Sequence, residues 1–310
     1  MQEFAETKDN RIREAIFRTV AFFDMFDYPL TANEIWKYLW QAPGVAMREL
    51  LEELDGEDWK NIVAMKNGFY FLTGREAIAE ERMRRYSYAD RKFKKAMRIA
   101  KIFRFIPWIR MIAVANLIGA HNLKDGSDID FFIIVKKNKI WLVRFFTNLT
   151  TIMLGLRPRP GSLRDKICLS FYLSEENMDL ERFLIDEQDV NFVYFAAGLT
   201  PIYVHDFNLE KFYKANSWIK KYLPNWQLAE ILERRKVAAI TPAVYDWIMD
   251  MIFSFLENSL KRLQLRKLPK EITEMMNKDT RVIVNDQVLK FHTKDKRKEY
   301  SERWRNKNYK

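Results

Sequence analysis

The sequence predicts an α+β protein with an N-terminal unit of helices and a hairpin, a central mixed sheet flanked by helices, and a C-terminal helical domain. Three observations predict this fold class. Near the N-terminus, apolar residues recur at helical spacing and are followed by a two-residue turn signal. Before residue 135, two short apolar runs lie on either side of a polar loop. After residue 206, apolar residues again recur mostly at helical spacing. A chain of 310 residues has room for two or three domains. We expect the N-terminal unit at residues 1–79, a connecting helix at residues 80–106, the central domain at residues 107–205 and the C-terminal domain at residues 206–310.

In the N-terminal unit, residues 11–27 carry apolar side chains at helical spacing. Thr31, followed three residues later by Glu34, predicts a capping box at the start of a second helix. A third short helix is expected over residues 46–54. Asn67 and Gly68 then separate two short apolar runs, which predicts a hairpin with strands over residues 62–66 and 69–73.

The order of these elements, with the run Phe26-Asp27-Tyr28-Pro29-Leu30-Thr31 and the hairpin run Asn67-Gly68-Phe69-Tyr70, resembles a winged helix-turn-helix domain over about residues 11–76. In that family the third helix enters the major groove of DNA and the hairpin touches the backbone. Here the third helix carries Arg48 against four acids, Glu49, Glu52, Glu53 and Asp55, which would repel phosphates. A module for protein contact or positioning and a module for nucleic-acid binding both remain open.

The connecting segment is strongly basic. Residues 80–110 carry Arg82, Arg84, Arg85, Arg91, Lys92, Lys94, Lys95, Arg98, Lys101, Arg104 and Arg110 but only three acids. Apolar residues keep helical spacing within it, so we predict a long basic helix with one buried stripe. It is either a solvated connection or a surface that contacts nucleic acid or a nucleotide.

The central segment contains the most informative motif. An apolar strand is expected over residues 111–115, a polar loop over residues 116–126, and a buried strand that begins at a pair of carboxylates, Asp128 and Asp130. Residues two apart on a strand face the same side, so the two carboxylates project together. They repel each other unless a cation lies between them, and Mg²⁺ prefers such oxygen ligands. A metal held in this way serves phosphoryl or nucleotidyl transfer.

The run Gly126-Ser127-Asp128-Ile129-Asp130-Phe131 resembles the polymerase-beta-type nucleotidyltransferase superfamily over about residues 107–205. The resemblance implies transfer of a nucleoside monophosphate from a nucleoside triphosphate with Mg²⁺ or Mn²⁺. It makes Asp128 and Asp130 the catalytic residues and metal ligands. The expected phosphate-site residues are Ser127, Asn116, Gly119 and His121, the last of which is alternatively a plain loop histidine.

Two further arginines are candidates for phosphate binding. Arg157 and Arg159 alternate with prolines that hold the loop extended, so they form either a phosphate clamp or a stiff surface connection.

The sequence departs from the superfamily pattern in two places. After the first strand it has Asn116 and Leu117 where the family has a Gly-Ser pair. The neighbouring strand predicted over residues 166–173 offers no third carboxylate, since Asp165 precedes it and Glu175 follows it. The motif still favours a nucleotidyltransferase, active or degenerate, with an unknown nucleic-acid or protein acceptor. The alternative is a non-catalytic nucleic-acid-binding or regulatory protein on the same scaffold.

The C-terminal part is expected to be mostly helical. Amphipathic helices are predicted over residues 209–223, 228–240 and 243–263, and the apolar face of the last must pack against something. A short hairpin is expected over residues 281–291. Residues 294–310 form a basic tail, mobile or ordered by an anionic partner.

Composition narrows the class of protein and of partner. The chain is 48% hydrophobic and 31% charged, which excludes a disordered chain and an integral membrane protein. Its net charge is +11, which favours an anionic partner. Cys168 is its only cysteine, so no internal disulfide can form; we expect a reducing, cytoplasmic setting and a core position for Cys168.

No membrane partner is expected. The first ten residues lack the pattern of a secretory signal. The most apolar stretch, residues 140–156, is shorter than the roughly 20 residues of a membrane span and contains Arg144 and Asn148. We predict a helix buried in a globular core there.

Overall fold

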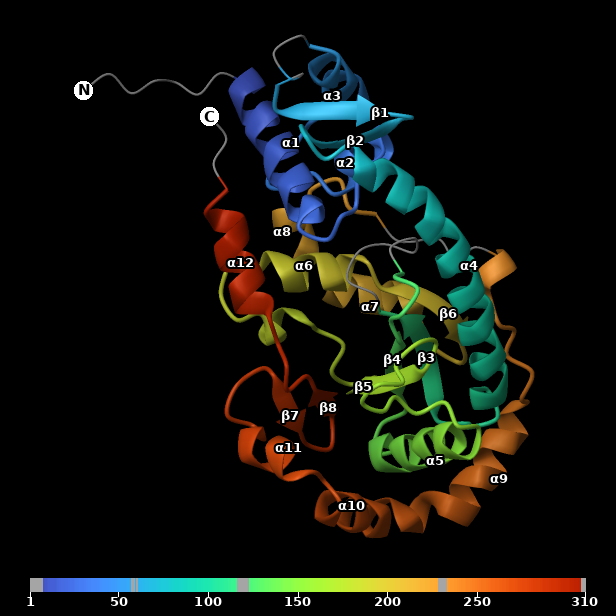
Figure 1. Ribbon diagram of the computed structural model, residues 1–310. Coiled ribbons are helices and arrows are strands. Elements are labelled where there is room, and N and C mark those ends of the chain that lie inside the picture. Colours follow the sequence, from blue (N-terminus) through green and yellow to red (C-terminus); the bar gives the residue numbers. More distant parts are fainter. Residues whose placement is uncertain (1–7, 57–58, 60, 116–122, 228–232, 308–310) are drawn as a thin grey trace.

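The computed structural model describes the chain apart from residues 1–7, 57–58, 60, 116–122, 228–232 and 308–310 (Figure 1). It confirms the α+β class. The centre is a six-stranded mixed sheet in the order β6-β3-β4-β5-β8-β7, in which β4 and β5 are parallel and the other neighbours are antiparallel. The strands are β3 (Ile109–Val114), β4 (Ile129–Val135), β5 (Ile167–Ser174), β6 (Thr200–Val204), β7 (Val282–Val284) and β8 (Val288–Phe291).

The N-terminal elements follow the predicted order: α1 (Lys8–Asp24), α2 (Ala32–Lys37), α3 (Met47–Leu54), β1 (Val63–Lys66) and β2 (Phe69–Leu72). Thr31 and Glu34 form the predicted capping box. Asn67 and Gly68 both have positive φ, 55° and 76°, as a two-residue hairpin turn requires. Short-range sequence patterns therefore predicted the helices and strands of this unit correctly.

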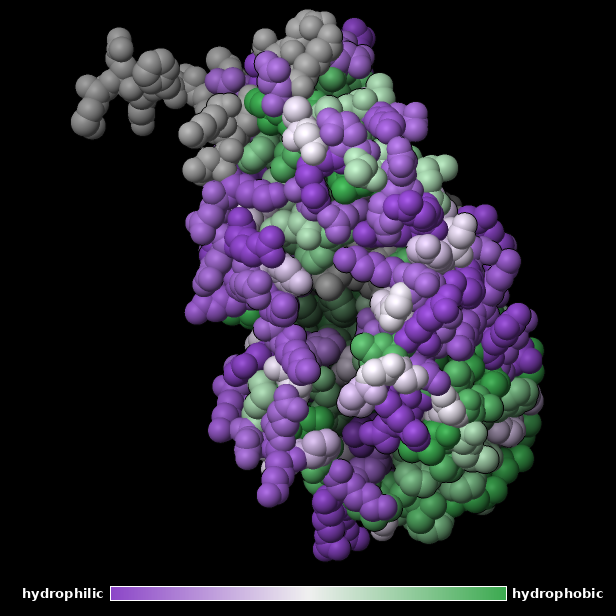
Figure 2. All heavy atoms as spheres, viewed as in Figure 1, coloured by the Kyte–Doolittle hydropathy of each residue, from purple (hydrophilic) through white to green (hydrophobic). Residues whose placement is uncertain are grey.

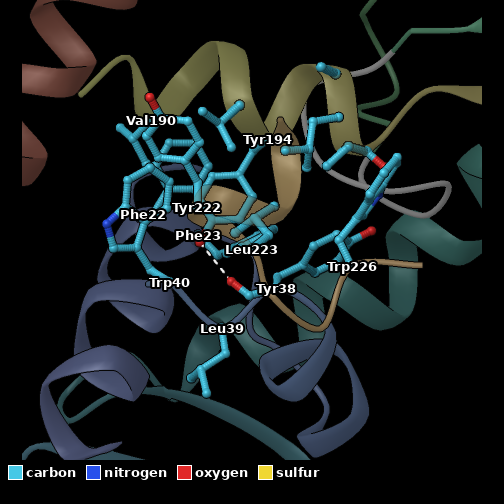
Figure 3. Close-up of a cluster of buried hydrophobic side chains, with 14 of the residues drawn as sticks. Phe22, Phe23, Tyr38, Leu39, Trp40, Val190, Tyr194, Tyr222, Leu223 and Trp226 are labelled. Atoms are coloured by element: carbon cyan, nitrogen blue, oxygen red, sulfur yellow. Dashed lines mark hydrogen bonds between the residues drawn. The ribbon is translucent and has the colours of Figure 1, made fainter. Parts of the chain in front are cut away.

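An aromatic cluster joins the N-terminal unit to the central sheet (Figure 3). Phe22 of α1 stacks on Tyr194 of α6 (Val190–Ala197), with ring centroids 4.4 Å apart. The Tyr194 hydroxyl donates to the Tyr38 carbonyl oxygen at 2.9 Å. Trp40 packs edge to face on Trp304 near the C-terminus, at 5.0 Å. The two regions thus share one hydrophobic core.

Helices cover both faces of the sheet. One face packs against α6, α7 (Leu209–Ala215) and α8 (Ile219–Tyr222). The opposite face packs against α4 (Ala77–Phe103), α5 (Ile140–Met153), α9 (Ala243–Phe253) and α10 (Glu257–Arg266). The remaining helices are α11 (Lys270–Met275) and α12 (Arg297–Arg305). No helix in the described part of the chain is long and apolar enough to cross a bilayer.

Helix α4 is the predicted basic helix, but several of its cations are not solvated. Arg82, Arg85 and Lys92 are buried. Arg82 donates to both carboxylate oxygens of Glu34, at 2.7 and 2.8 Å, and its guanidinium lies over the Tyr28 ring. The buried stripe is present as predicted, and it also takes in these three cations, whose charges are used inside the protein.

The C-terminal part differs from the prediction in two segments. Within residues 233–240 only a short 3₁₀ helix forms, Glu233–Arg235, because Val237 then donates to Ile202 and extends beside β6. Residues 297–305 form α12 instead of a mobile tail, since Trp304 is buried and its indole N–H donates to the Arg18 carbonyl.

The predicted hairpin is present as β7 and β8. It pairs with β5 and completes the central sheet, so residues 206–310 contribute strands to the central unit as well as helices. The predicted stretch 209–223 is divided into α7 and α8.

Candidate functional site

The two predicted carboxylates lie side by side at the beginning of β4. Asp128 directly precedes the strand, and Asp130 is its second residue. Cys168 on the parallel strand β5 is the register partner of Asp130. One ligand atom from each of the three residues lies within 4.8 Å of the other two. The structure therefore brings the predicted acids together and adds a thiol to them.

A β-bulge explains why Cys168 faces the acids. Asp130 pairs with Cys168 and Phe132 with Phe171, so β5 has two residues where β4 has one. The extra residue moves Phe171 into the core that contains Phe132, whereas Ile167 lies in the opposite core. Strict alternation along a strand would instead put Ile167 and Phe171 on one face. The expectation that Cys168 is a core residue is also corrected, since it is half-buried and lines a cleft.

Burial raises the pKa of both acids. Burial, and secondarily the charge of Asp128, raise the pKa of Asp130 to about 7. Burial also raises the pKa of Asp128, against the opposing charge of Lys92. The pKa of the Cys168 thiol is raised well above its ordinary value by burial and by the Asp130 charge, so the thiol is neutral at pH 7. Without a cation, the pair does not carry two full charges near neutral pH.

A buried lysine fixes the loop that presents the acids. Lys92 of α4 is fully buried, and its ammonium donates to the Ser127 carbonyl and, at 2.9 Å, to Asp165. The Asp165 N–H donates to the same carbonyl at 3.0 Å. The Ser127 hydroxyl donates to the Lys124 carbonyl at 3.0 Å, so this predicted phosphate-site residue lines the cleft with its hydroxyl bonded to the loop.

The acids near β5 do not complete a carboxylate triad. Asp165 forms ion pairs with Lys92 and Arg91; burial alone would raise its pKa, but these hydrogen bonds and charges lower it. Glu175 pairs instead with Arg110 at 3.1 Å. Among the residues that the structure describes, the cluster contains two carboxylates and one thiol, with no third acid.

The acids open into a cleft of about 730 Å³. A hollow lies near the middle of the face shown in Figure 2. Side chains from β4, β5 and α6 and from residues 290–300 line the cleft. Its lining includes five basic side chains, Lys124, Lys290, Lys294, Lys296 and Arg297, the last of which pairs with the lining acid Asp295. It also includes a group of aromatic rings, Phe26, Phe131, Phe171, Phe192, Phe195, Phe291 and Tyr300. Such a lining suits an anionic ligand with an unsaturated ring.

Five predicted site residues remain to be placed. Asn116, Gly119 and His121 lie outside the described residues. Arg157 and Arg159 are exposed on the loop after α5 and do not line the cleft. Arg159 instead forms a backbone bridge with Ser162, which agrees with a stiff surface connection.

Sequence reasoning missed the cleft wall that comes from β8 and α6. Lys290 is buried, and burial together with Arg297 lowers its pKa to about 7. His292 lies 2.9 Å from the Ser170 hydroxyl, and its pKa is lowered to about 3, first by burial and then by Lys290, so its imidazole is neutral at pH 7. Asn191 is buried, and its amide nitrogen has no hydrogen-bond partner in the described part of the structure. The sequence signalled the hairpin but not its pairing with β5.

We compared the chain with protein-family models, with curated proteins and with solved structures, and none of the three comparisons gives a match. The interpretation of the site therefore depends on its own residues and geometry.

Proposed function

We propose that this protein binds a nucleoside triphosphate with a divalent cation at Asp128 and Asp130, and transfers the nucleoside monophosphate to an acceptor. The supporting observation is the carboxylate pair at the mouth of β4, which faces a cleft that carries the exposed Lys124, Lys294 and Lys296 and several aromatic rings. In this proposal the N-terminal unit, which has the element order of a winged helix, is a positioning module packed beside the central sheet.

The residues present suit a hard divalent cation only in part. Asp128 and Asp130 supply the oxygen ligands that Mg²⁺ and Mn²⁺ prefer. Burial, and secondarily the charge of Asp128, raise the pKa of Asp130, and a bound cation would oppose both effects. Cys168 is a neutral thiol and a poor Mg²⁺ ligand. When bound, the cation would polarise phosphate oxygens and neutralise developing charge. Its remaining ligands would have to come from the triphosphate and water.

The chain's own residues have distinct tasks in this proposal. Asp128 and Asp130 bind the cation, and Lys92 keeps the loop before them in place through the Ser127 carbonyl. The Cys168 thiol donates a hydrogen bond to Asp130, which favours the ionised carboxylate. Lys124 and Lys294, both exposed on the cleft, are suited to contact phosphate oxygens.

One observation favours a second function. The position next to Asp130 carries a thiol, and no third carboxylate among the described residues is available to accept a proton from an attacking hydroxyl. A protein that binds the nucleotide without turning it over, and regulates or binds nucleic acid, is consistent with this. The two functions share the nucleotide site and differ in catalysis.

The test measures binding and transfer separately. Calorimetric titration with Mg²⁺ or Mn²⁺ and each of the four ribonucleoside triphosphates should give saturable binding to the wild type. The divalent cation and the basic side chains of the cleft would both attract the phosphates. Asp130→Asn should weaken it by about tenfold or more, because a charged ligand is lost. Release of labelled pyrophosphate from a triphosphate labelled at the γ-phosphate then tests transfer.

Asp125→Asn is the matched control. Asp125 lies three residues from Asp128, pairs with Arg91 and Arg164 outside the cleft, and should leave binding unchanged. Equal binding by the wild type and Asp130→Asn would reject the proposal. Binding without pyrophosphate release would support the second function.

A further inference from the structure

The apolar face of α9 points outward. The sequence predicts that this face must pack against something, yet Val244, Trp247, Ile248, Met251 and Ile252 are all exposed. Phe255, in the 3₁₀ turn Ser254–Leu256 that follows, continues the stripe. Trp247 is 62% and Phe255 74% exposed. Large apolar side chains gathered in this way on one helix indicate an interaction surface.

The inner side of the same helix carries its acids. Asp250 accepts hydrogen bonds from the Trp108 indole at 2.6 Å and from Lys136, and pairs with Lys139 at 3.1 Å. These partners outweigh burial and lower the pKa of Asp250 to about 2. One helical turn earlier, Asp246 binds His205 at 3.0 Å.

Glu257, which follows the stripe, is also turned inward. It accepts the backbone N–H groups of Trp141 and Leu142, at 2.9 and 2.8 Å, and so caps the start of α5. These polar contacts on both sides of the stripe prevent α9 from rolling its apolar face inward, because doing so would leave buried charges unpaired.

The surface continues onto α5. Leu149, Ile152 and Met153 in its last turns are exposed, as is Leu154 directly after it. In Figure 2 the hydrophobic colouring gathers at the lower right, over the region of α9, α10 and α5 in Figure 1. The patch therefore extends beyond a single helix.

The exposed charges that flank the stripe along the chain are mostly basic, although Lys236 before it pairs with Glu233 at 2.9 Å. Between Val244 and Leu260 the only charged residues are the three inward acids, so the outer face has none. The nearest exposed charges along the chain are basic on both sides: Lys236 before the stripe, and Arg262, Arg266 and Lys267 after it. An apolar stripe with Trp and Phe, flanked by cations, has the composition of a helix that lies in the interface of an anionic membrane.

We propose that α9 and the end of α5 dock this protein on an anionic lipid surface, with α9 in the plane of the membrane. A second copy of the chain is the less favourable occupant. In a two-fold dimer through α9, the basic end at Arg262 would face its own copy if the helices run parallel. It would face residues 233–236, which stay net positive despite the Lys236–Glu233 pair, if they run antiparallel, so like charges would meet.

The lack of a spanning helix does not bear on this proposal. The sequence predicts no membrane partner because it contains no spanning segment, and the structure contains none in its described part. A helix that lies on the surface has no such length requirement. The docking is also independent of the proposed nucleotide site, since α9 packs on the face of the sheet opposite α6.

Co-sedimentation of the full chain with vesicles tests the proposal. One set of vesicles contains phosphatidylcholine alone, and the other contains about 30% phosphatidylglycerol. We expect binding to the anionic vesicles that weakens with salt. Trp247→Ser/Phe255→Ser should lower the affinity about tenfold or more, because it removes the apolar contact and leaves the net charge unchanged. Replacing Arg262, Arg266 and Lys267 with Gln should remove the preference for anionic vesicles.

The matched control is Met65→Ser/Met83→Ser. Both methionines are exposed, on β1 and α4, so this double variant removes apolar side chains outside the surface and should bind as the wild type does. Circular dichroism checks that each variant is folded. Equal binding by the wild type and Trp247→Ser/Phe255→Ser would overturn the proposal. Light scattering that shows a dimer of the wild type, and a monomer of the Trp247→Ser/Phe255→Ser variant, would also overturn it. The surface would then be a contact between two copies of the chain.

Discussion

At the scale of single residues, Asp130 links the proposed cation site to pH. Its pKa is raised to about 7, so the carboxyl must lose a proton before it can bind a cation in the neutral range. We expect the affinity for Mn²⁺ with a triphosphate to fall about tenfold per pH unit below this pKa and to level off above it. Calorimetry at pH 6 in two buffers of different ionisation enthalpy should detect the released proton. A flat affinity between pH 6 and 8 would contradict this assignment.

The same raised pKa affects the stability of the cation-free protein. The folded state binds a proton at Asp130 more tightly than the unfolded state does, so this contribution is fully present below the unfolded pKa of about 4 and is lost as the pH rises through about 7. Asp130→Asn removes the buried charge. We expect it to raise the free energy of unfolding at pH 8, on the order of 2 kcal/mol, with no gain at pH 4. Urea titrations at both pH values provide the measurement, and destabilisation at pH 8 would refute the prediction.

At the scale of elements, α4 connects the two parts of the chain through buried cations. Arg82 binds Glu34 in the N-terminal unit, and ten residues later Lys92 binds the loop before β4. Both face inward on one helix, although the sequence around them suggests a solvated basic surface. The helix therefore positions the site as well as connecting the two units.

This role predicts a particular double-mutant result. Lys92→Met removes the buried ammonium that pairs with the Asp165 carboxylate. It should lower the free energy of unfolding by about 3 kcal/mol. Lys92→Met/Asp165→Leu removes both charges and should recover much of that loss, because neither charge is then left unpaired. Cation affinity should stay low in both variants, since the Ser127 carbonyl has lost its ammonium donor. Urea unfolding and calorimetry measure the two effects, and additive stability losses would show that the pair is not coupled.

The elements that were predicted correctly have local signals. The Thr31–Glu34 capping box, the Asn67-Gly68 turn and the carboxylate pair of β4 all depend on residues within a few positions of each other. The bulge in β5 that turns Cys168 toward the acids depends on pairing between strands about 40 residues apart, for which the sequence gives no short-range signal.

The larger errors have the same cause. The wall formed by Lys290 and His292 depends on β8 pairing with β5, more than 100 residues away. The outward face of α9 arises because the helix uses Asp246 and Asp250 as its inner contacts, which hydrophobic periodicity cannot reveal. Long-range pairing and buried charge, more than local propensity, determine the cleft and the surface proposed above.

At the scale of the whole molecule, the aromatic cluster predicts that the N-terminal unit and the central sheet unfold together. Tyr194 contacts Phe22 and Tyr38, and Trp40 contacts Trp304, so separating the two regions would expose a large buried aromatic surface. Trp40→Ala should lower the unfolding free energy by about 3 to 5 kcal/mol while the transition remains single. Circular dichroism follows the backbone and fluorescence follows the packing of the nine tryptophans, and the two curves should coincide in the wild type. Met65→Ala, at an exposed position of β1, should shift neither curve. An early separate transition in the wild type would show that the N-terminal unit is an independent domain, and the positioning role assigned to α4 would then fail as well.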